Sequence, residues 1–329
     1  MGGFGEVQVR LEGRDLSIGH KGVPLASKLD PKLYAQELVC FLGPNGVGKT
    51  TLLKTLVGLM PALDGEVFWG GEPLAGLSSL ERAKQLSLVL TGKPLAPLFP
   101  VLELVALGRQ PHTGPFGRLG PIDQEKIERA LELAQIKDLS NRFLGQLSDG
   151  QLQRVMIARA LAQDTPTLVL DEPTAFLDLP HRLSILNLLH QLAAQEGKSI
   201  LLSTHELDLA LRLADRLWLM DAQGSLVQGA PEDLVLSGDL GRAFGLSGFD
   251  PLTGGFTAVH LLNKGLVLEA QGLEAVWAKR ALARAGWAAL PYSQTKLTKV
   301  PDGPWVLTGP PGNGEFLALG DLVRHLRKH

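Results

Sequence analysis

Residues 43–50 constrain the fold more than any other part of the chain. They read Gly-Pro-Asn-Gly-Val-Gly-Lys-Thr and fit the pattern G-x-x-x-x-G-K-[ST], between an apolar run at 38–42 and a helical run at 51–56. Glycines allow the backbone to curl until successive N–H groups face one anion, and the positive end of the following helix points to the same place. The pattern therefore predicts a phosphate-binding loop between a strand and a helix.

Two side chains at the end of this loop indicate which phosphate compound it binds. A lysine in the place of Lys49 reaches the β- and γ-phosphates of a nucleotide, and a hydroxyl in the place of Thr50 ligates Mg²⁺. A second glycine cluster at 309–315 echoes the pattern, but Glu315 stands where the lysine belongs and its charge would repel phosphate. We therefore expect a nucleotide site at residues 43–50 and an ordinary loop at 309–315.

An apolar run at 167–170 ends in two carboxylates, Asp171 and Glu172. Buried parallel strands seldom end in this way without a ligand. We expect Asp171 to hold Mg²⁺, directly or through water, and Glu172 to polarise the attacking water. A helix cap is the alternative for an isolated acidic pair, but the phosphate loop earlier in the chain favours the catalytic interpretation.

Two further polar segments fall near the expected site. Ser148 and Asp149 precede a helical run at 152–162, where they either cap the helix or present a hydroxyl and free N–H groups to an anion. His205 follows an apolar run at 199–202, at the sheet edge where parallel-sheet sites gather. Both segments are candidates for nucleotide contacts.

Hydrophobic periodicity predicts an α/β body. Short apolar or alternating runs up to residue 90 indicate strands and turns, and the period changes to that of helices between 100 and 163. Strands and helices then alternate, which implies a largely parallel sheet covered by helices. The expected strands are 7–11, 37–42, 66–69, 85–90, 167–170, 199–202 and 216–220. The expected helices are 101–108, 123–136, 152–162, 180–194 and 207–214.

The length of 329 residues favours a second, smaller domain, because single cores stop growing near roughly 250–300 residues. A glycine-rich stretch at 245–255 reads as a linker. We predict a main domain at 1–245, with a helical insert at about 91–163, and a small α+β appendage at 246–329. The appendage holds a helical run at 273–285 and three of the five tryptophans, Trp277, Trp287 and Trp305.

Composition excludes several classes of partner and site. The 32 basic and 34 acidic residues give a formal net charge of −2, which offers no global electrostatic case for binding nucleic acid. The single cysteine, Cys40, can form neither an internal disulfide nor a cysteine-based zinc site. The sequence has no signal-peptide pattern and no apolar run near the roughly 18 residues of a spanning helix, so we expect a cytosolic location.

In their order along the chain, these motifs resemble those of the nucleotide-binding subunit of ABC transporters, over residues 6–245. Residues 43–50 resemble the Walker A loop, 168–171 the Walker B strand, 147–151 the ABC signature, 176–178 the D-loop, and His205 the switch histidine. The resemblance implies an ABC ATPase core of the P-loop NTPase fold, with a mixed sheet and a helical insert. It implies nucleotide contacts from Gly43, Pro44, Asn45, Gly46, Val47, Gly48, Lys49, Thr50, Thr51, His20, Ser148, Asp149, Gly150, Gln151 and Asp178.

The resemblance also implies a working arrangement. Two copies pair head to tail and trap two ATP molecules, each between the Walker A loop of one copy and Ser148 and Gly150 of the other. Glu172 is then the general base, and His205 senses the γ-phosphate. His20 stands where the family usually places an aromatic ring that stacks on adenine, and imidazole stacks over less surface.

Two positions depart from the family pattern. Thr91 stands where the family has a glutamine that touches Mg²⁺ and the attacking water, and its shorter side chain puts direct metal contact in doubt. Asp149 replaces the first signature glycine and places a carboxylate near the γ-phosphate of the partner's ATP. Lys49, Asp171, Glu172 and His205 are retained, so we expect hydrolysis to persist.

Residues 103–112 and 117–119 resemble the importers of iron-siderophore complexes, haem and cobalamin. The resemblance implies that polytopic permease subunits and, indirectly, an external substrate-binding protein are partners, with the chain peripheral on the inner face of the plasma membrane. Residues 91–120 would dock on the permease, with Leu95, Leu98 and Phe99 as apolar anchors.

Two other functions are kept as alternatives. One is a soluble ABC ATPase that acts on DNA, ribosomes or cluster assembly, against which stand the single phosphate loop and the near-neutral charge. The other is a regulator that binds ATP with little turnover, suggested by Thr91 and Asp149. The appendage is either a regulatory or dimer-supporting domain or a structural cap.

Overall fold

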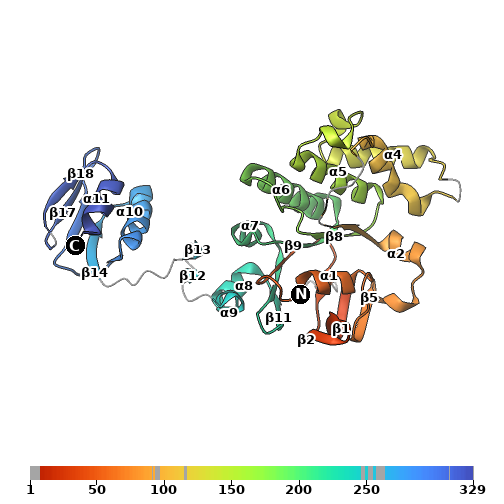
Figure 1. The fold of residues 1–329 in the computed structure, drawn as a ribbon, viewed down its shortest axis with the longest axis horizontal. Coiled ribbons are helices and arrows are strands. Elements are labelled where there is room, and N and C mark those ends of the chain that lie inside the picture. Colours follow the sequence, from red (N-terminus) through yellow and green to blue (C-terminus); the bar gives the residue numbers. More distant parts are fainter. Residues whose placement is uncertain are drawn as a thin grey trace, which may run out of the picture. The chain divides into compact units, whose positions relative to one another are not determined.

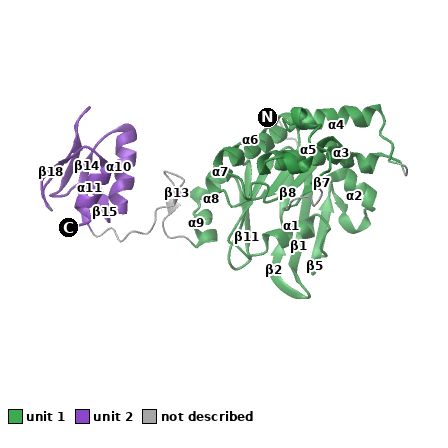
Figure 2. Cartoon of the chain, turned by 45° about the horizontal axis from the view of Figure 1, so that its top comes forward, with its two compact units in different colours: residues 1–246, 251–255 green, residues 247–250, 256–329 purple. Residues whose placement is uncertain are grey.

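The fold is taken from a computed structural model, which describes residues 8–90, 92, 97–114, 117–245, 249–250, 255–256, 264–310 and 312–328. The chain divides into two compact units (Figure 2). Unit 1 comprises residues 1–246 and 251–255, and unit 2 comprises residues 247–250 and 256–329. Each unit has its own hydrophobic core.

A six-stranded sheet forms the centre of unit 1. Its strand order is β11-β10-β4-β9-β8-β7, and every neighbouring pair whose register is recorded is parallel except β10 with β11. The central strands are buried along their full length, as expected of continuous apolar runs in a sheet covered on both faces. The strands are β4 (Leu38–Leu42), β7 (Leu86–Val89), β8 (Thr167–Asp171), β9 (Ser199–Ser203), β10 (Arg216–Met220) and β11 (Leu226–Gly229).

Helices pack around this sheet (Figure 1). Side chains from several strands fill the core beneath them, and the rings of Phe41 and Trp218 meet edge to face with centroids 5.8 Å apart. Phe41 belongs to β4 and Trp218 to the neighbouring β10, so this contact lies beside the strand that leads into the phosphate loop. The covering helices are α1 (Lys49–Leu56), α6 (Leu179–Glu196), α7 (Leu207–Leu213), α8 (Pro231–Leu236) and α9 (Asp239–Phe244).

A second, antiparallel sheet has the order β2-β1-β5-β6, with β3 also paired to β1. The prediction of a short strand at 7–11 was wrong, because β1 runs from Val9 to His20. Asp15 adopts a left-handed φ of 48° next to a register shift, so a polar bulge interrupts the strand without ending it. The strands are β1 (Val9–His20), β2 (Val23–Leu29), β3 (Lys32–Tyr34), β5 (Asp64–Trp69) and β6 (Glu72–Pro73).

A helix that the sequence did not predict lies between β6 and β7. α2 (Ser79–Gln85) is capped by Ser78, whose hydroxyl accepts from the backbone N–H of Glu81 while the Glu81 side chain accepts from Ser78 N. This capping box satisfies two helix-end donors, and it explains how so short a polar segment forms a helix.

The helical insert gathers on the side of unit 1 away from β1, β2 and β5 (Figure 1). It contains α3 (Val101–Ala106), α4 (Pro121–Leu133) and α5 (Asp149–Ala162), with 3₁₀ turns at Leu107–His112, Lys137–Leu139 and Leu144–Gln146. The helix predicted at 101–108 thus changes to 3₁₀ geometry at Leu107. A further 3₁₀ turn, Leu74–Gly76, precedes α2.

The described part of unit 2 contains a five-stranded mixed sheet, order β15-β14-β16-β17-β18, and two helices. Trp287 and Trp305 belong to its buried core, whereas Trp277 is 52% exposed. The second glycine cluster follows β17, and its last two residues, Gly314 and Glu315, belong to β18, which pairs antiparallel with β17. The elements are β14 (Lys264–Glu269), α10 (Gly272–Arg284), β15 (Trp287–Ala289), β16 (Lys296–Lys299), β17 (Trp305–Thr308), β18 (Gly314–Phe316) and α11 (Leu319–Leu326), after a short pair β12 (Phe249–Asp250) and β13 (Gly255–Phe256).

In the part of the chain that the structure describes, no helix has both the length and the apolar character needed to cross a bilayer.

Candidate functional site

The phosphate loop leaves the end of β4 and turns into α1. A side chain could not replace Gly43, because a methyl carbon there would lie 2.4 Å from the carbonyl oxygen of Met220. Gly48 caps α1 with a left-handed φ of 111°, which glycine adopts at little cost. The backbone therefore leads the loop directly into the positive end of the helix.

Lys49 folds back over this loop. Its Nζ donates to the carbonyl oxygens of Gly43 at 2.8 Å and Pro44 at 2.9 Å, and only 6% of the residue is exposed. Burial lowers the pKa of this ammonium, while the carboxylates of Glu172 and Asp171 act in the opposite direction. The lysine is thus a desolvated cation whose present partners are neutral carbonyls.

Asp171 meets the phosphate loop at the end of β8. Its Oδ1 lies 3.4 Å from the hydroxyl of Thr50 and accepts from Ser203 Oγ at 2.7 Å. Ser203 was not singled out from the sequence as a site residue. The pairing of β8 with β9 sets Asp171 opposite Ser203, so a predicted register for the two strands is the signal that would have found it.

Glu172 turns away from Asp171 although the two are adjacent. It has a left-handed φ of 49°, and its backbone N–H donates to Ser203 Oγ at 2.9 Å. Its Oε1 lies 2.7 Å from Nε2 of His205, and both side chains are partly exposed. One buried serine therefore holds the carboxylate of Asp171 and the backbone of Glu172, and the Glu172 side chain is partly exposed beside an imidazole.

His20 lies at the end of β1, next to the start of α1. Its Nε2 is 3.3 Å from the hydroxyl of Thr51, and the residue is exposed. This contact brings an accessible imidazole beside the phosphate loop, although 31 residues separate the two in the sequence.

The signature segment lies at the start of α5, where Ser148 is the N-cap residue. Ser148 caps α5 by accepting from Gln151 N at 3.3 Å, and Gln151 Oε1 accepts from Ser148 N at 3.0 Å. Of the two interpretations left open for Ser148, helix capping is therefore observed. Asp149 lines a cavity of about 230 Å³ that Glu172 and Phe176 also line.

Asp178, in the expected D-loop, caps α6 by accepting from His181 N at 3.1 Å. Thr91, expected near the metal ion, lies outside the described residues, as does Leu95 of the expected docking surface. Leu98 is 81% exposed and Phe99 is half-buried.

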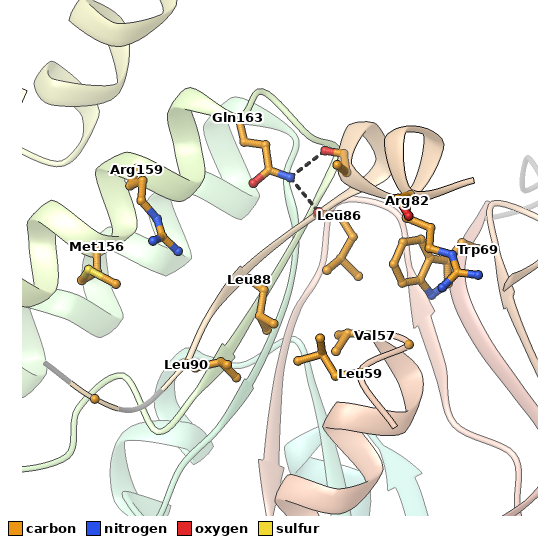
Figure 3. Close-up of a pocket in the computed structure, with 14 residues that line it drawn as sticks. Val57, Leu59, Trp69, Arg82, Leu86, Leu88, Leu90, Met156, Arg159 and Gln163 are labelled. Carbon is orange, nitrogen blue, oxygen red and sulfur yellow. Dashed lines mark hydrogen bonds between the residues drawn. The ribbon is translucent and has the colours of Figure 1, made fainter. Parts of the chain in front are cut away.

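A groove of about 650 Å³ lies between α1, α2, β7 and α5 (Figure 3). Leu59, Leu88 and Met156 supply apolar surface, and Arg82 and Arg159 stand on its walls. Burial lowers the pKa of Arg159. Gln163 holds the upper end together, since its amide donates to the carbonyls of Ala83 at 2.6 Å and Leu86 at 3.0 Å.

Comparison with known proteins identifies this arrangement. The family model described as ABC transporter matches residues 26–175. The ferric enterobactin transport ATP-binding protein FepC of Escherichia coli is 35% identical over 241 residues, which cover 73% of this chain and 89% of FepC. The chain belongs to the ABC transporter ATP-binding family. As a family member it is an ATPase, with the ABC ATPase form of the P-loop fold that the sequence predicted.

Other relatives and solved structures agree with this assignment. The iron(3+)-hydroxamate import ATP-binding protein FhuC of Bacillus subtilis is 40% identical over 62% of this chain and 76% of its own length. The cobalamin import ATP-binding protein BtuD of Halobacterium salinarum is 34% identical over 76% of this chain and 63% of its own. A dimeric, post-hydrolysis structure of the cassette MJ0796 with ADP and Pi superposes with a TM-score of 0.59 at 26% identity, over 67% of this chain and 98% of that one.

Proposed function

We propose that this chain is the energy-coupling ATPase of an importer for metal chelates of the iron-siderophore, haem or cobalamin type. The transport roles of FepC, FhuC and BtuD support this substrate class, because ferric enterobactin, iron(3+)-hydroxamates and cobalamin all carry a chelated metal ion. The observation that carries the enzymatic part is the Glu172–His205 pair, which lies next to Asp171 and the phosphate loop.

The phosphate loop binds ATP by exchanging neutral partners for charged ones. Lys49 gives up the carbonyls of Gly43 and Pro44 and donates to phosphate oxygens, which form stronger, charge-assisted hydrogen bonds. The backbone N–H groups from Gly46 to Thr51 face the same anion at the positive end of α1. His20 stacks on the adenine ring at the edge of the site.

The residues at the end of β8 suit Mg²⁺. Thr50 and Asp171 offer a hydroxyl and a carboxylate whose oxygens lie 3.4 Å apart, and Mg²⁺ prefers such oxygen ligands. When bound with ATP, Mg²⁺ neutralises negative charge on the phosphates. Ser203 holds the Asp171 carboxylate in place, and Thr91 is assigned no contact with the metal ion.

Glu172 acts as the general base. Its carboxylate is accessible, and its backbone is fixed by Ser203, so it can accept a proton from a water that approaches the γ-phosphate. His205 orients this carboxylate from the side and contacts the γ-phosphate. Proton acceptance and phosphate sensing are thus assigned to two groups that already touch each other.

The ATP site is completed by a second copy of the chain in a head-to-tail dimer. Ser148, Gly150 and Gln151 at the start of α5 contact the partner's nucleotide, and Asp178 lies at the same interface. The dimeric MJ0796 cassette supports this arrangement. Phe176 fits an interface position as well, because it is apolar and 88% exposed in the isolated chain.

Multiple-turnover hydrolysis separates this proposal from a regulator that binds ATP without consuming it. The purified full chain is expected to release many phosphates per chain with Mg-ATP, and to fall to background in EDTA because the phosphate charge is no longer neutralised. Phosphate release measured over time checks this. A reaction that stops at one phosphate per chain would favour a regulator that binds ATP with little turnover. Asp149 would then be assigned an inhibitory role.

The groove beside α5 is the docking site for the permease. Its apolar floor and two arginines fit an amphipathic helix that carries a carboxylate, presented by the membrane subunit. Leu98, which is 81% exposed, extends the apolar surface predicted for docking.

Leu59→Glu is expected to abolish docking while leaving ATP hydrolysis by the isolated chain unchanged. Leu59 is 55% exposed, so a carboxylate is tolerated in the free chain, but its burial on binding would be costly. Co-purification of the tagged chain with the permease from gently solubilised membranes measures this. Leu236→Glu, on α8 at a position 82% exposed, is the matched control. Equal recovery of the permease with both variants would exclude the groove.

His20→Ala is expected to raise the KM for ATP about five- to tenfold, since stacking of a base on an aromatic ring contributes about 1–3 kcal/mol and imidazole offers a small ring. His20→Tyr is expected to lower KM, because a larger ring covers more of the adenine. Initial rates at varied ATP concentrations test both. Identical KM values in all three proteins would remove His20 from the nucleotide site.

A further inference from the structure

His181, in the first turn of α6, contacts two segments assigned to the dimer interface. Its Nδ1 and its backbone N–H both lie within hydrogen-bond distance of Oδ1 of Asp178, the backbone contact at 3.1 Å. The hydrogen bond from the imidazole lowers the pKa of the Asp178 carboxyl group, so this group is held as an anion. The D-loop carboxylate is thus fixed by both the backbone and the side chain of one residue.

The other side of the same ring lies against the signature segment. A methyl carbon on Gly150 would stand 2.5 Å from Cδ2 of His181 and 3.0 Å from its Cγ. The imidazole therefore occupies the space that a side chain at 150 would need. Arg154 and Ser184 are also hydrogen-bonded, so the N-terminal halves of α5 and α6 are in contact at two places.

The next residue, Arg182, faces the catalytic side. Its Nε donates to the carbonyl of Leu177 in the D-loop, and its guanidinium pairs with Glu206 at 2.5 Å. Glu206 follows His205, which contacts Glu172. Two consecutive residues of α6 therefore connect the signature segment with the loop that carries the switch histidine.

We infer that His181 is a positioning residue that holds the D-loop and the signature segment of one chain at the spacing needed to close on a second copy. This inference rests on the proposed dimer, in which the signature segment serves the partner's ATP while His205 serves the chain's own. His181 touches neither ATP in this account. It acts through Asp178 and Gly150, and with Arg182 it links the two ATP sites through one short stretch of helix.

The test uses full-length chains that also carry Glu172→Gln, so that ATP is bound without being consumed. In this background, His181→Ala is expected to raise the ATP concentration for half-maximal dimer formation at least tenfold. Without the intrachain contacts of His181 with Asp178 and Gly150, the D-loop and the signature segment must be ordered at the moment of pairing. ATP affinity of the monomer, measured at protein concentrations too low for dimers, is expected to change less than twofold. Analytical ultracentrifugation and nucleotide binding give the two numbers.

Two further variants make the result specific. In His181→Asn, the amide nitrogen takes the place of Nδ1 and the amide oxygen that of Cδ2, so dimer formation is expected to return to within about threefold of the parent. His190→Ala, on the same helix, removes an imidazole that contacts the carbonyl of Leu213 instead and is expected to have no effect.

Three results would overturn the inference. They are dimer formation by His181→Ala at the parent's ATP concentration, an equal loss of monomer ATP affinity, or an Asn variant as impaired as the Ala variant. Failure of the parent Glu172→Gln chain itself to dimerise with ATP would contradict the proposed dimer, and the inference with it.

Discussion

Glu172→Gln is expected to lower the kcat for ATP hydrolysis by two to four orders of magnitude while ATP still binds. The amide occupies the same volume and can still contact His205, but it cannot accept the proton of the attacking water, and general-base catalysis is worth about 10²–10⁴-fold. The KM or Kd for ATP is expected to stay within about threefold, because Lys49 and the loop backbone are untouched. Phosphate release and nucleotide binding by the purified chain measure the two effects.

A control separates this loss from a general effect of removing a carboxylate. Glu132→Gln, at an exposed position on α4 paired with Lys137, is expected to hydrolyse ATP at the parent rate. If Glu172→Gln also retained the parent rate, Glu172 would not be the base. The Glu172–His205 contact would then be a hydrogen bond without a catalytic role.

Lys49→Met is expected to weaken ATP binding about 100-fold or more. Lys49 is buried, and in the nucleotide complex it makes charge-assisted hydrogen bonds, each worth roughly 1.5–3 kcal/mol. Methionine has a similar length and fills the same space, so the loop is expected to keep its conformation. Titration with a fluorescent ATP analogue measures the Kd.

Lys54→Met is the matched control, since Lys54 lies in the last turn of the same helix and does not reach the loop. It is expected to bind ATP as the parent does. Equal affinity of the Lys49 and Lys54 variants would show that the N–H groups of the loop and the dipole of α1 suffice for phosphate binding.

The candidate site was predictable to the extent that short motifs and strand ends determine it. β4, β9 and β8 are neighbouring parallel strands, so their carboxyl ends lie at the same edge of the sheet. Lys49, Asp171 and His205 follow or end these strands and fall at that edge, as the sequence predicted. Ser203 was missed because its role depends on the register of two strands 32 residues apart. His181 was missed because its contact with Gly150 depends on how two helices pack.

In the fold too, features set by local sequence were predicted, and features set by pairing between distant segments were not. The buried strands were predicted nearly to the residue, since a continuous apolar run bounded by polar residues leaves little choice. β1 was predicted too short because the polar residues after Leu11 interrupt its apolar pattern, whereas pairing with β5 continues through Glu12 and Gly13 and shifts register only beyond Arg14. α2 was missed because none of its side chains is buried. The helix has no apolar face to show in the sequence, and only its capping box at Ser78 indicates it.

Uptake of metal chelates by the native host tests the central claim most directly. The gene for this chain is deleted, and uptake of a labelled panel of ferric siderophores, haem and cobalamin is compared after return of the parent chain or of Glu172→Gln. The account predicts that uptake of one chelate class is lost on deletion, returns with the parent chain, and does not return with Glu172→Gln. Unchanged uptake of every chelate after deletion would contradict it and would favour an ABC ATPase that works outside transport.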